Sequence, residues 1–198
     1  MSEDRNPTAP VLLPHALIAL LLIAIGVVGR WGQPDWCVTP LAAVGLLAGY
    51  ALPRRWALLV PLAALAASDG LLPTYGSAGV VISVYAVMIV PALLGVWLRR
   101  PVNSVTTGVA RLVGVSALPS VTFFFTTNFA VWAFQSLYPK TLAGLAECYI
   151  AALPFFRRML VGDVAYTGLL FAAAAIAGAY SLRGRPAENA SGELIVER

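Results

Sequence analysis

The strongest constraint in this sequence is its series of long apolar segments separated by short polar ones. Of its 198 residues, 60% are hydrophobic and only 11% are charged, whereas soluble domains contain roughly 25% charged residues. A helix needs roughly 20 apolar residues to cross a bilayer. The sequence therefore excludes a soluble globular enzyme and predicts an all-α integral membrane protein. The six expected transmembrane helices cover 11–29, 37–52, 56–68, 79–98, 112–133 and 164–182.

The segment 135–162, between the fifth and sixth expected helices, does not follow this pattern. Its apolar part, 142–153, is too short to span a bilayer. Pro154 would remove a helical hydrogen bond and clash with the preceding turn. We expect a short re-entrant or interfacial helix that packs on protein. In the alternative topology, residues 140–158 cross the membrane instead.

The expected helices leave no room for a separate soluble domain. We expect one membrane domain over 11–182, a cytoplasmic tail over 1–10 and a disordered cytoplasmic tail over 183–198. The first apolar segment has acidic residues before it and no small-residue cleavage site after it, so we expect it to be retained. The net charge is +4. With the N-terminus inside, most arginines fall on the cytoplasmic side, as is typical of membrane proteins. We expect a multi-pass membrane protein with both termini cytoplasmic.

In this topology, aromatic and polar side chains gather on the outer side of the membrane. Rings with a few polar groups around a hollow are typical of a small-molecule site. An aromatic belt at the membrane surface would explain the same residues without a ligand. The candidate substrate-binding residues are Trp31, Asp69, Tyr75, Asn128, Trp132, Tyr138, Lys140, Cys148 and Asp163.

Two acidic residues at the ends of apolar segments each allow a structural and a functional interpretation. Ionisable groups at membrane depth are expensive and often functional. Asp69 is either a ligand contact or the partner of Arg30, Arg157 or Arg158. Asp163 either binds a ligand or caps the free N–H groups of the helix expected after it.

Other polar and small residues leave similar alternatives open. Asn128 bonds either a neighbouring helix or a ligand, because a buried amide needs a partner. Cys148 is either a soft ligand for a metal-bearing cofactor or, more commonly, a small packing residue. The spacing of Gly45 and Gly49 predicts close helix contact, either within the chain or with a partner.

Motifs for catalysis and for nucleotide binding are missing from the sequence. It contains no G-x-x-x-x-G-K-[ST] phosphate loop, no H-E-x-x-H and no G-x-S-x-G. A single His and two Cys make a metal cluster unlikely to form. We therefore expect a protein that is not an enzyme, carries no cofactor or metal and binds no nucleic acid.

Several short motifs resemble the signature of a family of small bacterial inner-membrane proteins, described only as a domain of unknown function. They are TPLAA at 39–43, TNFAVW at 127–132, YPKT at 138–141, AGL at 143–145, CYIAALPFF at 148–156 and GD at 162–163. The resemblance covers about half of the chain densely. It implies family membership and a location in the bacterial inner membrane. It implies little chemistry, because the activity of that family is not established.

More loosely, the size, the six segments and the outward loops are similar to the substrate-binding S components of energy-coupling factor transporters. That similarity implies capture of a vitamin-like or cofactor-precursor molecule by the loops at 31–36, 69–78 and 135–162. Beside the lipid bilayer, it implies a transmembrane coupling subunit with ATPases as a partner. The alternative function is a non-transporting membrane subunit or assembly factor of a larger envelope complex.

Overall fold

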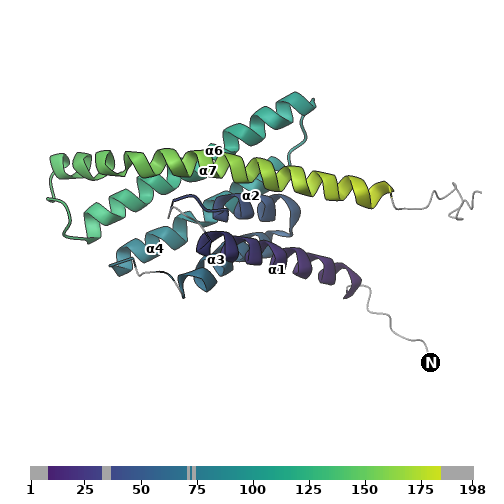
Figure 1. The fold of residues 1–198 in the computed structure, drawn as a ribbon, viewed down its shortest axis with the longest axis horizontal. Helices are drawn as coiled ribbons and strands as arrows, with labels where there is room; N and C mark the ends of the chain where they lie inside the picture. Colours follow the sequence, from purple (N-terminus) through teal and green to yellow (C-terminus); the bar gives the residue numbers. More distant parts are fainter. Residues whose placement is uncertain (1–8, 33–36, 71, 73–74, 184–198) are drawn as a thin grey trace, which may run out of the picture.

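The computed structural model describes residues 9–32, 37–70, 72 and 75–183. Within this part of the chain all regular secondary structure is helical, as predicted. Most of the expected tails, together with Asp35 and Trp36 of the first loop, lies outside the described residues. The helices are α1 (Ala9–Trp31), α2 (Leu41–Ala51), α3 (Arg54–Asp69), α4 (Ala78–Val87), α5 (Ile89–Leu98), α6 (Val105–Phe134) and α7 (Leu142–Arg183) (Figure 1).

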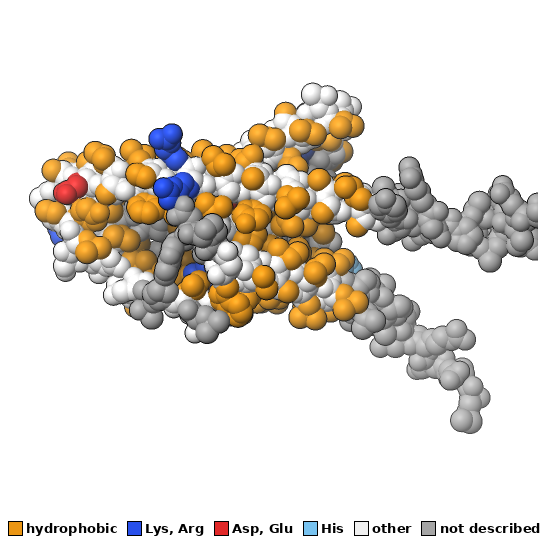
Figure 2. All heavy atoms as spheres, in the orientation of Figure 1, with side chains coloured by type: hydrophobic (Ala, Val, Ile, Leu, Met, Phe, Trp, Pro, Cys, Tyr) orange, Lys and Arg blue, Asp and Glu red, His pale blue; other side chains and the backbone are white. Residues whose placement is uncertain are grey.

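Three helical segments are long and apolar enough to cross a membrane: Ala78–Leu98, Val105–Phe134 and Leu142–Gly178. The described apolar helices His15–Trp31 and Leu41–Ala51 are shorter. The face drawn in Figure 2 is covered mainly by hydrophobic side chains, with few charged groups among them. These features are compatible with a membrane protein, and the count of six spans stays a prediction.

The fourth predicted segment consists of two helices, α4 and α5, that meet at Met88. Pro91 follows three residues later and has no N–H to donate to the carbonyl of Val87. The α-helical pattern is therefore interrupted in the middle of an apolar segment. Met88 and Pro91 both line the cavity described below.

The prediction of a separate short helix over 142–153 is wrong, because α7 runs without a break from Leu142 to Arg183. Pro154 lies inside this helix. A proline within a helix costs about 3 kcal/mol. The long packing contact of α7 with α6 outweighs that cost, since the two helices lie side by side (Figure 1).

The short helix α2 is the centre of the molecule, and residues 41–49 are all buried. It packs against α3, α5 and α7. A Cβ atom on Gly49 would lie 2.1 Å from the carbonyl oxygen of Ala92, and one on Gly95 would lie 2.1 Å from that of Leu46. The backbones of α2 and α5 therefore touch. The spacing of Gly45 and Gly49 predicted close helix contact either within the chain or with a partner. In the structure both glycines are in close contact with α5 of the same chain.

The two ends of the helix assembly differ in chemistry. At the arginine end, which contains Arg54, Arg55, Arg99, Arg100 and Arg111, side chains bond the ends of neighbouring helices. Arg99 donates to the carbonyls of Gly49 and Leu52, at the end of α2. The start of α1 and the end of α7 point toward this end (Figure 1). The opposite end contains Arg30, Asp69 and the turn between α6 and α7.

Candidate functional site

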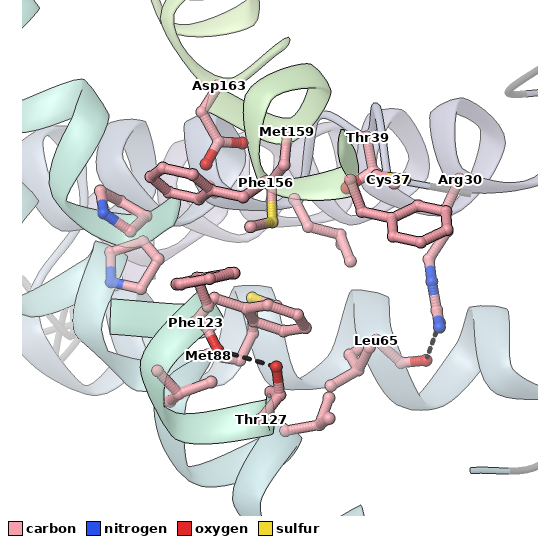
Figure 3. A pocket seen from close by; sticks show the side chains of 18 of the residues that line it. Arg30, Cys37, Thr39, Leu65, Met88, Phe123, Thr127, Phe156, Met159 and Asp163 are labelled. Atoms are coloured by element: carbon pink, nitrogen blue, oxygen red, sulfur yellow. Dashed lines mark hydrogen bonds between the residues drawn. The ribbon is translucent and has the colours of Figure 1, made fainter. Parts of the chain in front are cut away.

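A cavity of about 480 Å³ lies among the helices, and each of the seven contributes to its lining (Figure 3). Its size falls within the range of roughly 300–1,000 Å³ that is usual for small-molecule sites. The cavity lies at the start of α2, where Thr39, Leu41 and Ala42 face it. Because α2 has only 11 residues, it is about 16 Å long and begins inside the assembly.

The walls of the cavity are mainly apolar and rich in rings. Phe123 and Phe124 come from α6, and Phe155 and Phe156 come from α7. The ring centroids of Phe124 and Phe156 are 4.7 Å apart, so these rings join the two helices as well as lining the cavity. Such a wall favours a ligand with an apolar or aromatic body.

At one end of the cavity lies a polar cluster that we call the Arg30–Asp69 cluster, formed by Arg30, Ser68, Asp69, Tyr75 and Tyr85. The Arg30 guanidinium forms an ion pair with Asp69, and these side chains are 12% and 21% exposed. The hydroxyls of Tyr75 and Tyr85 each donate to the Asp69 carboxylate at 2.9 Å. Arg30 is thus the partner present among the three considered for Asp69.

The phenol of Tyr75 is strongly affected by this position. Burial raises the pKa of Tyr75 to about 12, and the hydrogen bond to Asp69 and its negative charge act in the same direction. The charge of Arg30 opposes them and has the second-largest effect. Tyr75 therefore remains a neutral hydrogen-bond donor at the edge of the cavity.

Asp163 lies near the middle of α7, is 5% exposed and lines the cavity. The interpretation of Asp163 as a helix cap is wrong, because α7 has no N-terminus there. Its carboxylate accepts a hydrogen bond from the Ser120 hydroxyl at 2.5 Å. Among the described residues no arginine, lysine or histidine forms an ion pair with it. In Figure 3 the carboxylate points into the cavity beside Phe156.

Asn128 also lines the cavity, one residue after Thr127. Its side-chain N–H donates to the carbonyl of Phe124 at 2.8 Å, so this bond is made within α6. Thr127 does the same with Phe123. The bond to a neighbouring helix considered for the Asn128 side chain is not among those of the described residues.

Six predicted site residues do not line the cavity, and one of them, Asp69, belongs to the Arg30–Asp69 cluster at its end. Trp31 donates from its indole N–H to the carbonyl of Ser68 at 3.0 Å. Cys148 is buried, and its thiol donates to the Asn128 carbonyl at 3.4 Å, a contact between α7 and α6. The described residues contain no group of three His, Cys, Asp or Glu side chains that could hold a metal ion.

Of the other three, Trp132 lies in the last turn of α6, and Tyr138 and Lys140 lie between α6 and α7. Trp132 donates from its indole N–H to the carbonyl of Pro139 at 2.9 Å. Lys140 donates to the carbonyls of Trp132 and Gln135, at the end of α6. A cation at a helix C-terminus compensates the free carbonyls there, so these contacts stabilise the turn.

The residues that sequence reasoning missed are mostly apolar. The runs of phenylalanine at 123–125 and 155–156 were the available signal, but a ring within an apolar segment more often contacts lipid or core. Nothing in the sequence indicated that Ser120 contacts Asp163, because the two residues are 43 positions apart and belong to different helices.

The fold and the cavity define an all-helical protein with membrane-type helices and a site of small-molecule size. Residues 11–185 match the family of unknown function DUF6580, and the chain belongs to this family. No curated protein matches the chain. Membership in a family of unknown function is thereby confirmed. The similarity to S components stays a prediction, and function must be argued from the cavity.

Proposed function

We propose that the protein is a substrate-binding membrane transport protein that takes up a small vitamin-like or cofactor-precursor molecule. The observation that carries this proposal is the cavity of about 480 Å³, with ring-rich walls and a few polar groups. Protein interiors are close-packed, with few voids larger than a water molecule. A space of this size at the meeting point of seven helices therefore supports a binding role.

The features that create the cavity also support this proposal. The break between α4 and α5 at Met88 and the prolines Pro91 and Pro119 border it. Each of these features weakens regular helix packing. Burial of an apolar group the size of a leucine or phenylalanine side chain is worth about 1.5–3 kcal/mol. A ligand that fills the cavity would bury apolar surface that the helices do not bury against each other, and this burial would stabilise the complex.

In the proposed uptake cycle, the ligand enters from the end where Arg30 and Tyr75 line the cavity. The arginine end faces the cytoplasm, following the positive-inside rule. Opening the Arg30–Asp69 ion pair would move α1 away from α3 and widen the entrance. A transmembrane coupling subunit with ATPases would supply the energy.

The first test is a thermal-stability screen of the purified full chain in mild detergent. The panel contains vitamins, cofactor precursors and metal complexes. A compound at 100 times its Kd should stabilise the folded state by about 2.7 kcal/mol. A compound that binds would then be tested for uptake into cells that produce the protein.

Two variants of α6 provide matched controls for any compound that binds. Phe123 lines the cavity, whereas Phe129, on the same helix, is exposed and does not line it. Phe123→Ala should raise the Kd at least tenfold, and Phe129→Ala should leave it unchanged. The proposal is overturned if the two variants bind alike. If no compound raises the thermal stability and the protein forms stable cross-links to an envelope complex, the alternative of an assembly factor is favoured.

A further inference from the structure

We propose that the cavity binds an organic cation, whose ammonium-type group lies at Asp163 and whose apolar or aromatic part lies against the phenylalanine walls. This inference rests on the proposed small-molecule site and names the chemical class of its ligand. It follows from the charges that face the cavity, from the position of Asp163 and from the rings around it.

The charges around the cavity do not balance. Of the described residues that line it, one is a basic residue, Arg30, and one is an acid, Asp163. Arg30 is already ion-paired with Asp69, so these two charges cancel. The N-terminus of α2 also faces the cavity, and a helix N-terminus contributes roughly half a positive charge. An ionised Asp163 therefore leaves the site net negative, which favours a cation and disfavours an anion.

The geometry of Asp163 leaves room for a ligand. An ionised carboxylate has about four acceptor sites, and Ser120 supplies one hydrogen bond. One carboxylate oxygen accepts the bond from Ser120 of α6, and the side chain also lines the cavity, where Figure 3 shows it beside Phe156. Burial of a carboxylate without a cationic partner costs several kcal/mol. A ligand ammonium at this position would offset that cost and use the remaining acceptor sites.

The rings beside Asp163 suit the same ligand class. Phe156 lies next to the carboxylate in Figure 3, and its ring packs against that of Phe124 at an interplanar angle of 38°. The face of an aromatic ring carries partial negative charge and attracts a cation within about 6 Å. The rings would also contact the apolar part of the ligand. A ligand carboxylate would meet like charge at Asp163 and the negative faces of the rings.

The test compares three probes that share one phenyl group and one chain length: phenylpropylamine, phenylpropanol and phenylpropanoate. Their Kd values are measured by equilibrium dialysis against the full chain in mild detergent near neutral pH. We expect the amine to bind about tenfold more tightly than the alcohol, a difference of about 1.4 kcal/mol. The carboxylate should bind most weakly.

Two variants of α7 then assign the preference to one side chain. Asp163→Asn should remove the preference for the amine over the alcohol. Glu147→Gln makes the same change on an exposed position of the helix, and it should keep the preference. Size-exclusion chromatography and melting curves establish that both variants are folded. If Asp163→Asn does not fold, the comparison of the three probes on the unaltered chain still tests whether the cavity prefers a cation.

The possible failures are distinguishable. Tight binding of the alcohol or the carboxylate, with no advantage for the amine, overturns the cation inference and leaves a small-molecule site in place. An amine preference that survives in Asp163→Asn overturns the role of Asp163. If none of the three probes binds, the cation inference is overturned, whereas the proposed function is decided separately by the thermal-stability screen and the Phe123→Ala variant.

Discussion

Asp69 and Asp163 are two acids in apolar surroundings, one close to the cavity and one in its lining, yet their partners differ completely. Asp69 receives an arginine and two tyrosine hydroxyls. Asp163 receives one serine hydroxyl and, among the described residues, no cation. Both charges are expensive to bury. The first is compensated by Arg30, whereas the second has only a serine hydroxyl as a partner among the described residues.

The positions of the two acids along their helices explain part of this difference. Asp69 is the last residue of α3, where the free carbonyls already carry partial negative charge. An acid there needs a nearby cation, and Arg30 at the end of the adjacent α1 supplies it. Asp163 lies in the middle of a 42-residue helix, far from either end. Its environment is decided by the cavity and not by its own helix.

The largest change in the free energy of unfolding should follow from removing Arg30, the cationic partner of Asp69. Arg30→Ala leaves Asp69 part-buried without a charge partner, and breaking such a pair costs about 3 kcal/mol or more. The free energy of unfolding would be measured by denaturation in mixed micelles. Arg157→Ala, which removes an exposed arginine of α7, should change it by less than about 0.5 kcal/mol. Equal effects of the two variants would contradict a compensating role for Arg30.

A smaller effect of opposite sign should separate the two acids directly. Asp163→Asn keeps a group that can accept the Ser120 hydrogen bond and removes a buried charge. We expect the ligand-free protein to gain about 1 kcal/mol in stability above neutral pH. Asp69→Asn should instead lose stability, because Arg30 is left unpaired. The comparison fails if both substitutions shift the unfolding free energy in the same direction.

The sequence predicted the helical class and the membership in a family of unknown function. Apolar segment length indicated membrane-type helices, and Arg30 was among the partners considered for Asp69. The prediction failed where local rules were overridden. Pro154 predicts a helix end, but packing of α7 along α6 lets the helix continue through this residue. The cap assigned to Asp163 failed for the same reason.

The cavity itself was harder to predict, because it depends on contacts between distant segments. Thr39, Pro91, Phe123 and Phe156 come from four parts of the chain and share no motif. In contrast, Trp132 and Lys140 have the residue types of a binding site. Both side chains instead donate hydrogen bonds to backbone carbonyls near the end of α6. This structural role could be recognised only from the three-dimensional contacts.

The smallest effect is confined to alkaline pH and tests the environment of Asp69 through its neighbour Tyr75. The pKa of Tyr75 is raised from 10.0 to about 12 in the folded protein, so the folded state holds this proton more tightly than the unfolded state. The stabilisation is complete below pH 10 and is lost as the pH rises through about 12. Melting temperatures of the unaltered chain should therefore fall more steeply between pH 10 and 12 than those of Tyr75→Phe. Parallel curves would contradict the burial of this phenol against Asp69, and the contrast between the two acids would then rest on Arg30 and Tyr85.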